Sequence, residues 1–389
     1  MSSIPITRTS HSLHHEKEFQ DAVDKINTAI QNALVSDKKY TNVGVLSLRW
    51  ENDDLNLGQI EIELLNTFKD TFNYVTESFV IPATTSSATA RAVTMRVGSF
   101  VAKYDNTSSL TIVIYQGHSH YTRYGMIPHP QLVLYGSSNP AVPTIPWSTI
   151  EALMPTDGDS LVILDTCSAS AAAMCGLNME YLVASAFESA SSAVIQRSFT
   201  RRLIDLLKSQ INPVMTVAQI HAMLVNQANS PATGLDYTPV HIACENKPSV
   251  TLRPLKRTPR ELSALEKGNA LADGKVLVSV LLQGKTSIPS ISEWEEWLAR
   301  AIPDGVADIK IEAVFETGSA LCLMTMPIAV FNMLKGHNPT GAYGFVAYVE
   351  SNNLMNSHEF RSHAMGFLSA RHGNIQMPVR ETKPSGSAE

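Results

Sequence analysis

The sequence predicts an α/β fold with a mostly parallel sheet flanked by helices, followed by a smaller α+β unit. Between Val43 and Leu255, short apolar runs typical of strands alternate with amphipathic runs typical of helices. That alternation gives a largely parallel sheet. After a charged stretch at 257–274 that contains Pro and Gly, the alternation begins again. We therefore expect this stretch to link two domains.

An amphipathic helix is expected in the N-terminal segment, 1–40. Its apolar residues recur every three or four positions and fall on one face: Phe19, Val23, Ile26, Ile30 and Leu34. This face either packs on its own domain or pairs with a partner. Packing is favoured, because the stripe is only a few turns long and a coiled coil usually sustains more heptads.

The larger domain, 41–256, has its predicted elements in a regular order. The first half consists of strand 43–50, helix 58–72, strand 74–81, helix 86–104 and strand 110–116. The second half consists of strand 160–165, strand 180–187, helices 198–210 and 216–228, and closing strands within 238–255. Between the halves, 119–147 is rich in Pro and aromatic residues and predicts a wall or lid over a cleft.

The C-terminal domain, 275–350, repeats the order β-α-β-β-α-β, which is the ferredoxin-like split unit. Its elements are strand 275–284, helix 290–302, strands 307–318 and 319–327, helix 328–336 and strand 342–351. RNA binding would need aromatics on the sheet and a basic surface, and neither is evident. We expect a regulatory or protein-contact domain, followed by a flexible tail, 351–389.

Two reactive side chains follow buried strands. LTIVIYQGHS delivers His118 at a Gly-His-Ser turn, and SLVILDTCSAS delivers Cys167. Alone, the cysteine could be a small buried residue and the histidine a turn residue. Together they lie at the carboxyl edge of one sheet, where ligands bind in open α/β folds. Their separation is also close to the interval of about 50 residues between the His and Cys of caspases.

These strands and motifs resemble the caspase and metacaspase group of cysteine peptidases, and most of all the caspase-like proteins of fungi. The resemblance runs from Asn42 to Leu255. It implies a caspase-like sheet in which Cys167 is the nucleophile and His118 the base, commonly acting as a dyad. The backbone N–H groups of Ser119 and Cys167 would stabilise the oxyanion.

Substrate recognition is also implied by the resemblance. Asp165 matches the Asp of the metacaspase primary pocket and would attract a basic side chain. An equal alternative is that Asp165, Ser168 or Ser170 caps the helix that follows. Ser185 and Glu188 correspond roughly to the other wall of the pocket, although strand-end polarity would explain them too.

The leading functional hypothesis is a cysteine endopeptidase acting on proteins or peptides. Arg123 would instead favour acidic substrates, although an acidic side chain would be repelled by Asp165. The main rival is an inactive caspase-fold pseudo-peptidase that binds proteins, because Ser119, Ala169 and Ser170 stand where the family usually has glycine. A third possibility is a thiol acyl-transfer enzyme on the same fold.

No cofactor or metal is expected. Residues 117–150 contain no Asp or Glu, so Ca²⁺ would lack its oxygen ligands. His118, His120 and His129 make zinc an alternative, but no downstream Asp-His motif and no Cys-x-x-Cys pair completes the pattern.

Composition is typical of an intracellular globular enzyme. The chain has 389 residues, 44% of them hydrophobic, with a net charge of −6, which gives no reason to expect nucleic acid or an anionic membrane as partner. Its four cysteines are dispersed and the first 19 residues have no apolar core for secretion, so we expect a cytoplasmic location. A homodimer, or a protein partner bound through the C-terminal domain, stays open.

Overall fold

The computed structural model describes residues 10–122, 131–139, 142–167, 179–185, 198–210, 213–229, 238–244, 247–255, 271, 274–282, 308–316, 320–335 and 343–349. These belong to one compact unit, Met1–Val349. Most of the expected linker, the expected helix 290–302 and the expected tail lie outside the described residues. Among the helices that are described, none is long and apolar enough to cross a membrane.

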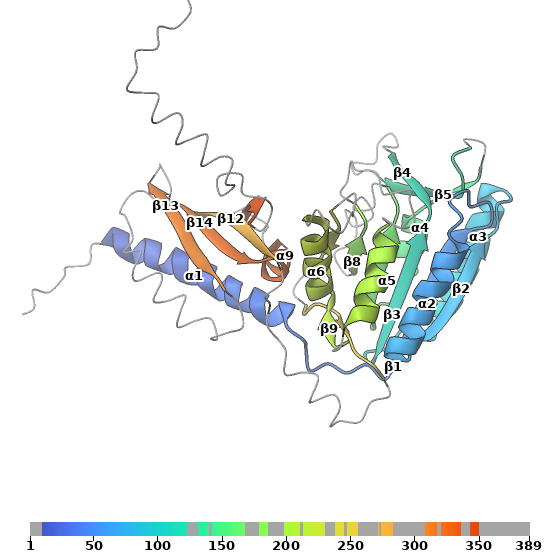
Figure 1. Cartoon of the computed structure of the whole chain (residues 1–389), viewed down its shortest axis with the longest axis horizontal. Coiled ribbons are helices and arrows are strands. Elements are labelled where there is room, and N and C mark those ends of the chain that lie inside the picture. The colour runs from blue at the N-terminus through green and yellow to red at the C-terminus, as the bar shows by residue number, and fades with distance from the viewer. Residues whose placement is uncertain are drawn as a thin grey trace, which may run out of the picture. The chain divides into compact units, whose positions relative to one another are not determined.

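The larger sheet has six strands, drawn from residues 42–242 (Figure 1). Its order is β10-β8-β7-β3-β1-β2, and every neighbouring pair is parallel except β10 with β8. The strands are β1 (Asn42–Trp50), β2 (Val75–Ile81), β3 (Ser109–Gln116), β7 (Asp159–Asp165), β8 (Glu180–Val183) and β10 (Val240–Ile242). This confirms the predicted mostly parallel sheet flanked by helices.

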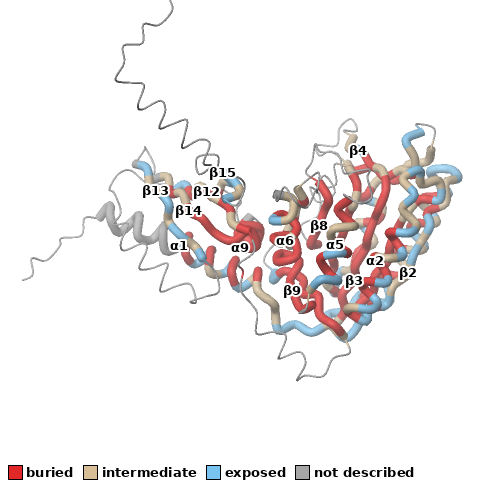
Figure 2. Tube along the Cα trace, in the orientation of Figure 1, coloured by how far each residue is buried: buried red, intermediate tan, exposed pale blue. Residues whose placement is uncertain are grey.

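Helices cover both faces of the central sheet, so its inner strands are apolar on both sides. Strand β3 is buried along its whole length, whereas much of the edge strand β2 is exposed (Figure 2). One face packs against α2 (Gly58–Phe72), α5 (Phe199–Ser209) and α6 (Val217–Asn229). The other packs against α3 (Ser86–Val101) and α4 (Ser148–Glu151).

An ion-pair cluster joins helices α2 and α5. Glu63 accepts two hydrogen bonds from Arg201, at 2.9 and 2.6 Å, and one from Lys208 at 2.7 Å. Hydrogen bonds from Arg201 are the main reason that the pKa of the Glu63 carboxyl falls to about 2. The paired charges fix the two helices side by side on the sheet.

A small antiparallel sheet, β4-β5-β6, replaces part of the expected loop 119–147. It consists of β4 (His118–Thr122), β5 (Gln131–Tyr135) and β6 (Thr144–Pro146). The expectation that His118 lies in a turn was therefore wrong, since it is the first residue of a strand and is paired with Tyr135. Leu132, Val133 and Leu134 are buried, and strand pairing supplies the hydrogen bonds that a buried backbone needs.

The closing strands of this domain do not pair with each other. Strand β10 joins β8 at the end of the central sheet, and β11 (Thr251–Leu252) pairs with the short strand β9 (Met215–Thr216). The distance along the chain between partners explains why sequence alone could not assign these pairings.

Residues 275–348 form a four-stranded antiparallel sheet in the order β13-β14-β12-β15. Its elements are β12 (Lys275–Leu282), β13 (Lys310–Glu316), β14 (Ala320–Pro327), α9 (Ile328–Lys335) and β15 (Tyr343–Tyr348). The first strand lies between the third and the fourth, which is the strand order of a ferredoxin-like sheet.

The N-terminal helix α1 (Ser10–Ala33) shares its core with this C-terminal sheet. Its buried residues Val23, Ile26 and Ile30 belong to one apolar cluster with Val278 and Phe331. The apolar stripe found in the sequence therefore packs within the same chain, against strands that lie about 250–320 residues further along the sequence.

Candidate active site

Three neighbouring strands deliver the candidate residues to one edge of the central sheet. Parallel strands β3 and β7 are in register from Leu110 with Asp159 to Gln116 with Asp165. His118 lies two residues beyond the end of β3, and Cys167 two residues beyond the end of β7. Strand β1 lies on the other side of β3, so the loop after β1 reaches the same edge.

A glycine turn connects β3 to β4 and sets the position of His118. Gly117 has φ of +148°, and a Cβ there would lie 2.8 Å from the Tyr115 hydroxyl. That hydroxyl donates to the backbone oxygen of His118 at 2.7 Å and accepts from the Trp50 indole at 3.1 Å. A side chain at this turn would therefore strain the backbone and press on the group that holds His118.

His118 is held by a carboxylate and an aromatic ring. Its Nε2 lies 2.5 Å from Oδ1 of Asp54. Its ring stacks on Tyr135, with centroids 5.4 Å apart and an interplanar angle of 11°. The His118 side chain is 20% exposed. The imidazole is thus fixed in orientation and is still reachable from solvent.

Asp54 is the site residue that sequence reasoning missed. Its Oδ2 accepts hydrogen bonds from the Ser138 backbone N–H at 2.9 Å and from the Ser138 hydroxyl at 2.8 Å. Together with His118 these bonds lower the pKa of the Asp54 carboxyl to about 2. The preceding residue, Asp53, caps the loop by accepting from the N–H groups of Leu55 and Leu57. Asp54 is therefore a carboxylate at neutral pH, held toward His118.

Cys167 carries a partly exposed thiol, and its backbone is bonded to the histidine strand. The Ser119 hydroxyl donates a short hydrogen bond to the Cys167 backbone oxygen. The Thr166 hydroxyl in turn donates to Ser119 Oγ at 2.7 Å, and Ser185 donates to the Thr166 backbone oxygen at 3.3 Å. Ser119, Thr166 and Ser185 are all buried. This chain of hydroxyls joins the ends of β4, β7 and β8.

Tyr135 links the three candidate residues electrostatically. Burial raises the pKa of its phenol, and the charges of Cys167 and Asp54 raise it further. Its ring also stacks on His118. The thiol, the carboxylate and the imidazole therefore gather around one aromatic side chain.

Asp165 binds the beginning of helix α5. Its Oδ2 accepts from the Thr200 backbone N–H at 3.1 Å and from the Thr200 hydroxyl at 2.7 Å. Gln116 donates to that same hydroxyl at 2.9 Å. Burial raises the pKa of the Asp165 carboxyl. Its other oxygen, Oδ1, has no hydrogen-bond partner among the described residues.

The other expected recognition residues are only partly described. Ser185 is fully buried and bonds to backbone, as above. Glu188, Arg123, Ser168 and Ser170 lie outside the described residues.

His118 and His120 lie on the same side of strand β4, since both rings contact Tyr135. The third histidine of the zinc alternative, His129, is not among the described residues. Within the part of the chain that is described, no group of three His, Cys, Asp or Glu side chains could hold a metal ion.

Comparisons with known proteins find similarity in fold only. No family model matches the chain, and no curated protein does. A structural-genomics protein from Geobacter sulfurreducens is similar with a TM-score of 0.37 and 11% identity, over 57% of this chain and 96% of that one. Caspase-1 from Spodoptera frugiperda is similar with a TM-score of 0.37 and 10% identity, over 57% of this chain and 93% of that one. Similarities this weak support no conclusion about family or chemistry.

Proposed function

We propose that this chain is a cysteine endopeptidase that acts on proteins or peptides in the cytoplasm, with Cys167 as nucleophile, His118 as base and Asp54 as the group that orients His118. The main support is the 2.5 Å hydrogen bond between Asp54 and His118, at the sheet edge that also carries Cys167. A nucleophile beside a base that a third group orients is the usual arrangement for covalent catalysis.

The Asp54 hydrogen bond determines which nitrogen of His118 acts as the base. A carboxylate only accepts, so the Nε2 atom that it contacts carries a proton and Nδ1 keeps its lone pair. Nδ1 has no hydrogen-bond partner among the described residues. In the proposed first step, Nδ1 takes the proton of the Cys167 thiol, and the thiolate attacks the scissile carbonyl carbon. The backbone N–H groups of Ser119 and Cys167 stabilise the oxyanion.

The second half of the proposed reaction returns that proton. The Nδ1–H of His118 protonates the leaving amine, the C–N bond breaks, and an acyl-thioester on Cys167 remains. Nδ1 then takes a proton from water as the water oxygen attacks the thioester carbonyl. The C–S bond breaks, the carboxylic acid leaves, and the Nδ1–H of His118 returns its proton to the Cys167 sulfur. Asp54 stabilises the imidazolium that forms in both halves.

We assign a basic side chain to the primary pocket, as expected from Asp165. Thr200 bonds only Oδ2 of this carboxylate, so Oδ1 can accept from a guanidinium or ammonium group. The role of Thr200 in this scheme is to hold the carboxylate in place. The competing assignment, an acidic side chain bound by Arg123, predicts the opposite preference.

The pseudo-peptidase alternative keeps one specific observation in its favour. Ser119 stands where the related family usually has glycine, and its hydroxyl bonds the backbone oxygen of Cys167. A binding scaffold would tolerate this fixed arrangement, whereas an enzyme needs room for the substrate backbone.

The test is intact-mass labelling with two acyloxymethyl-ketone peptides, one ending in Arg and one in Asp. We expect the Arg probe to add one mass equivalent to wild type, and the labelling to be lost in Cys167→Ala and slowed in His118→Ala. Cys244→Ser is the matched control, because Cys244 is also a partly exposed thiol. Burial raises the pKa of the Cys322 thiol to about 12, so it gives no background. Labelling of Cys167 no faster than of Cys244 would refute the peptidase.

A further inference from the structure

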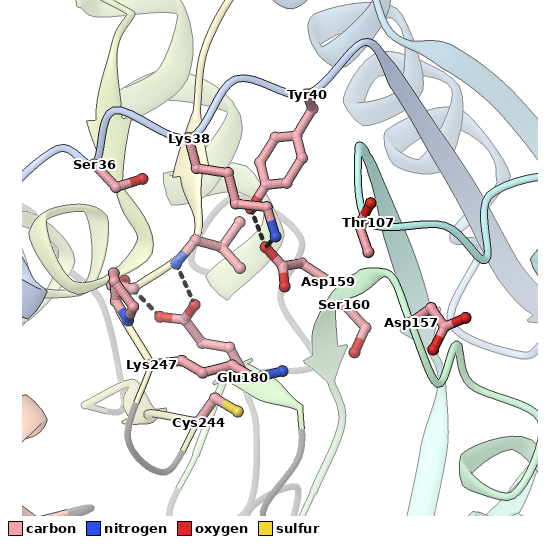
Figure 3. A pocket seen from close by; sticks show the side chains of 13 residues that line it. Ser36, Lys38, Tyr40, Thr107, Asp157, Asp159, Ser160, Glu180, Cys244 and Lys247 are labelled. Atoms are coloured by element: carbon pink, nitrogen blue, oxygen red, sulfur yellow. Dashed lines mark hydrogen bonds and ion pairs between the residues drawn. The ribbon is translucent and has the colours of Figure 1, made fainter.

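A cavity of about 270 Å³ lies at the edge of the central sheet opposite the candidate active site (Figure 3). It is lined by the beginnings of β7 and β8, by the segment before β1 and by the segment before β11. Strand β7 begins at Asp159 beside the cavity and ends at Asp165 beside Cys167. At about 3.3 Å per residue the two sites are roughly 20 Å apart. The cavity is therefore separate from the catalytic proposal.

A buried carboxylate forms the floor of this cavity and is fully satisfied by the protein. Glu180 is 1% exposed. Its Oε1 accepts from the Ser249 hydroxyl and bonds His241 Nε2, at 2.5 and 2.6 Å, and its Oε2 accepts from the Val250 N–H at 2.5 Å. A carboxylate bonded on both oxygens gives a rigid floor, and a ligand need not neutralise it.

The groups left free in the cavity carry both signs of charge. In Figure 3, the Lys247 side chain extends into the cavity from one side, and Asp157 lies on the other side, beside Thr107 and Ser160. Lys247 has no ion-pair partner among the described residues, and neither does Asp157.

Asp159 adds a second acceptor that is already held in position. Its Oδ2 accepts from the Lys38 ammonium and the Tyr40 hydroxyl, both at 2.7 Å. The same residue's Oδ1 makes no hydrogen bond with the described residues. Burial, together with Asp159, raises the pKa of the Tyr40 phenol, which therefore stays a neutral donor at physiological pH.

We propose that this cavity binds a small zwitterion, a free amino acid or a dipeptide, with its carboxylate at Lys247 and its ammonium at Asp157 and Asp159. Asp157 and Asp159 would repel a polyanion, and Lys38 and Lys247 would repel a simple amine. The cavity is just below the usual range for ligand pockets, which begins at about 300 Å³, and so suits a ligand of this size. Tyr40, Pro248 and Val250 give apolar surface for a side chain.

Calorimetric titration of the full chain with the free amino acids and a set of dipeptides tests this proposal. Leucine has two matched analogues: 4-methylpentanoate lacks its ammonium, and 3-methylbutylamine lacks its carboxylate. Corresponding analogues are made for whichever compound binds. We expect at least one zwitterion to bind and both of its analogues to bind at least about tenfold more weakly, because each loses a charge-assisted hydrogen bond.

Variants locate the site and separate it from catalysis. We expect Lys247→Ala and Asp157→Asn each to weaken binding by about tenfold or more. Lys69→Ala, which removes an exposed lysine on α2, should leave it unchanged, and so should Cys167→Ala. The proposal is wrong if no zwitterion binds below about 1 mM, a weak affinity of about 4 kcal/mol. It is equally wrong if inorganic phosphate or the analogues bind as well, or if Lys247→Ala has no effect.

Discussion

Replacing Asp54 with Asn tests the proposed catalytic arrangement most directly. The variant keeps the shape of the side chain and an oxygen that can accept from Ser138, but its amide nitrogen now faces Nε2 of His118. An N–H facing Nε2 favours the opposite imidazole tautomer, in which Nδ1 carries the proton and can no longer take one from Cys167. We therefore expect slower labelling of Cys167 by the Arg probe.

The size of this effect follows from the exposure of Asp54. A hydrogen bond to a charged group contributes about 1.5–3 kcal/mol. The Asp54 side chain is 37% exposed, and solvent screening favours the lower limit. About 1.4 kcal/mol corresponds to a tenfold slower reaction. Because the pKa of Asp54 is about 2, its carboxylate is charged throughout the working range, and the difference should persist between about pH 5 and 9.

The assay compares second-order labelling rates of wild type, Asp54→Asn and Asp53→Asn by mass spectrometry. Asp53 is the matched control, because it caps Leu55 and Leu57 and makes no hydrogen bond to His118. We expect Asp53→Asn to lower stability and to leave the labelling rate nearly unchanged. A folded Asp54→Asn that labels at the wild-type rate, or equal slowing by both variants, would refute the assigned role of Asp54.

Three further predictions concern stability. Glu63→Gln should lower the free energy of unfolding, measured by urea denaturation, by about 1 kcal/mol at pH 7. Because the pKa of Glu63 is depressed, this contribution is complete above about pH 4.5 and is lost as the pH falls through 2. A difference between wild type and variant that does not change with pH would contradict this. Gly117→Ala should lower the free energy of unfolding by about 1–3 kcal/mol, and it should slow labelling of Cys167 because the new Cβ presses on Tyr115. Gly98→Ala, on α3 with open space around it, should not destabilise the protein. Equal effects of the two variants would contradict this. Ser119→Ala should lower the free energy of unfolding by about 1 kcal/mol, because the hydrogen bond to Cys167 is lost. The labelling rate should not change, because the backbone N–H of residue 119 remains. A rate about 100-fold lower would show instead that the hydroxyl takes part in catalysis.

Residues whose place depends on local pattern could be predicted from the sequence. The apolar run before Gln116 and the run before Asp165 each specify a strand, and parallel strands bring their carboxyl ends to one edge. Hence His118 and Cys167 were expected together. The sheet order agrees with that expectation, although the chemistry stays a proposal.

Residues whose place depends on tertiary neighbours could not be predicted. Asp54 lies in a polar loop, and only the adjacency of β1 and β3 brings it to His118. A usable signal did exist, since an acidic pair directly after a buried strand is a candidate for the same sheet edge. Strand β4 was missed for a different reason: HSHYT has few apolar residues, and its partner β5 begins only at Gln131.

Helix α1 leaves the ribosome long before the strands that cover it. Ile30 and Phe331 share one core, and at about 5–20 residues per second their synthesis is separated by roughly 15–60 s. Late in that interval all strands of the central sheet have been made, while Val23, Ile26 and Ile30 still lack the part of their core that β12–β15 and α9 supply. A nascent or truncated chain that lacks β12–β15 would leave much of this apolar stripe uncovered, and we expect such chains to bind holdase chaperones or aggregate.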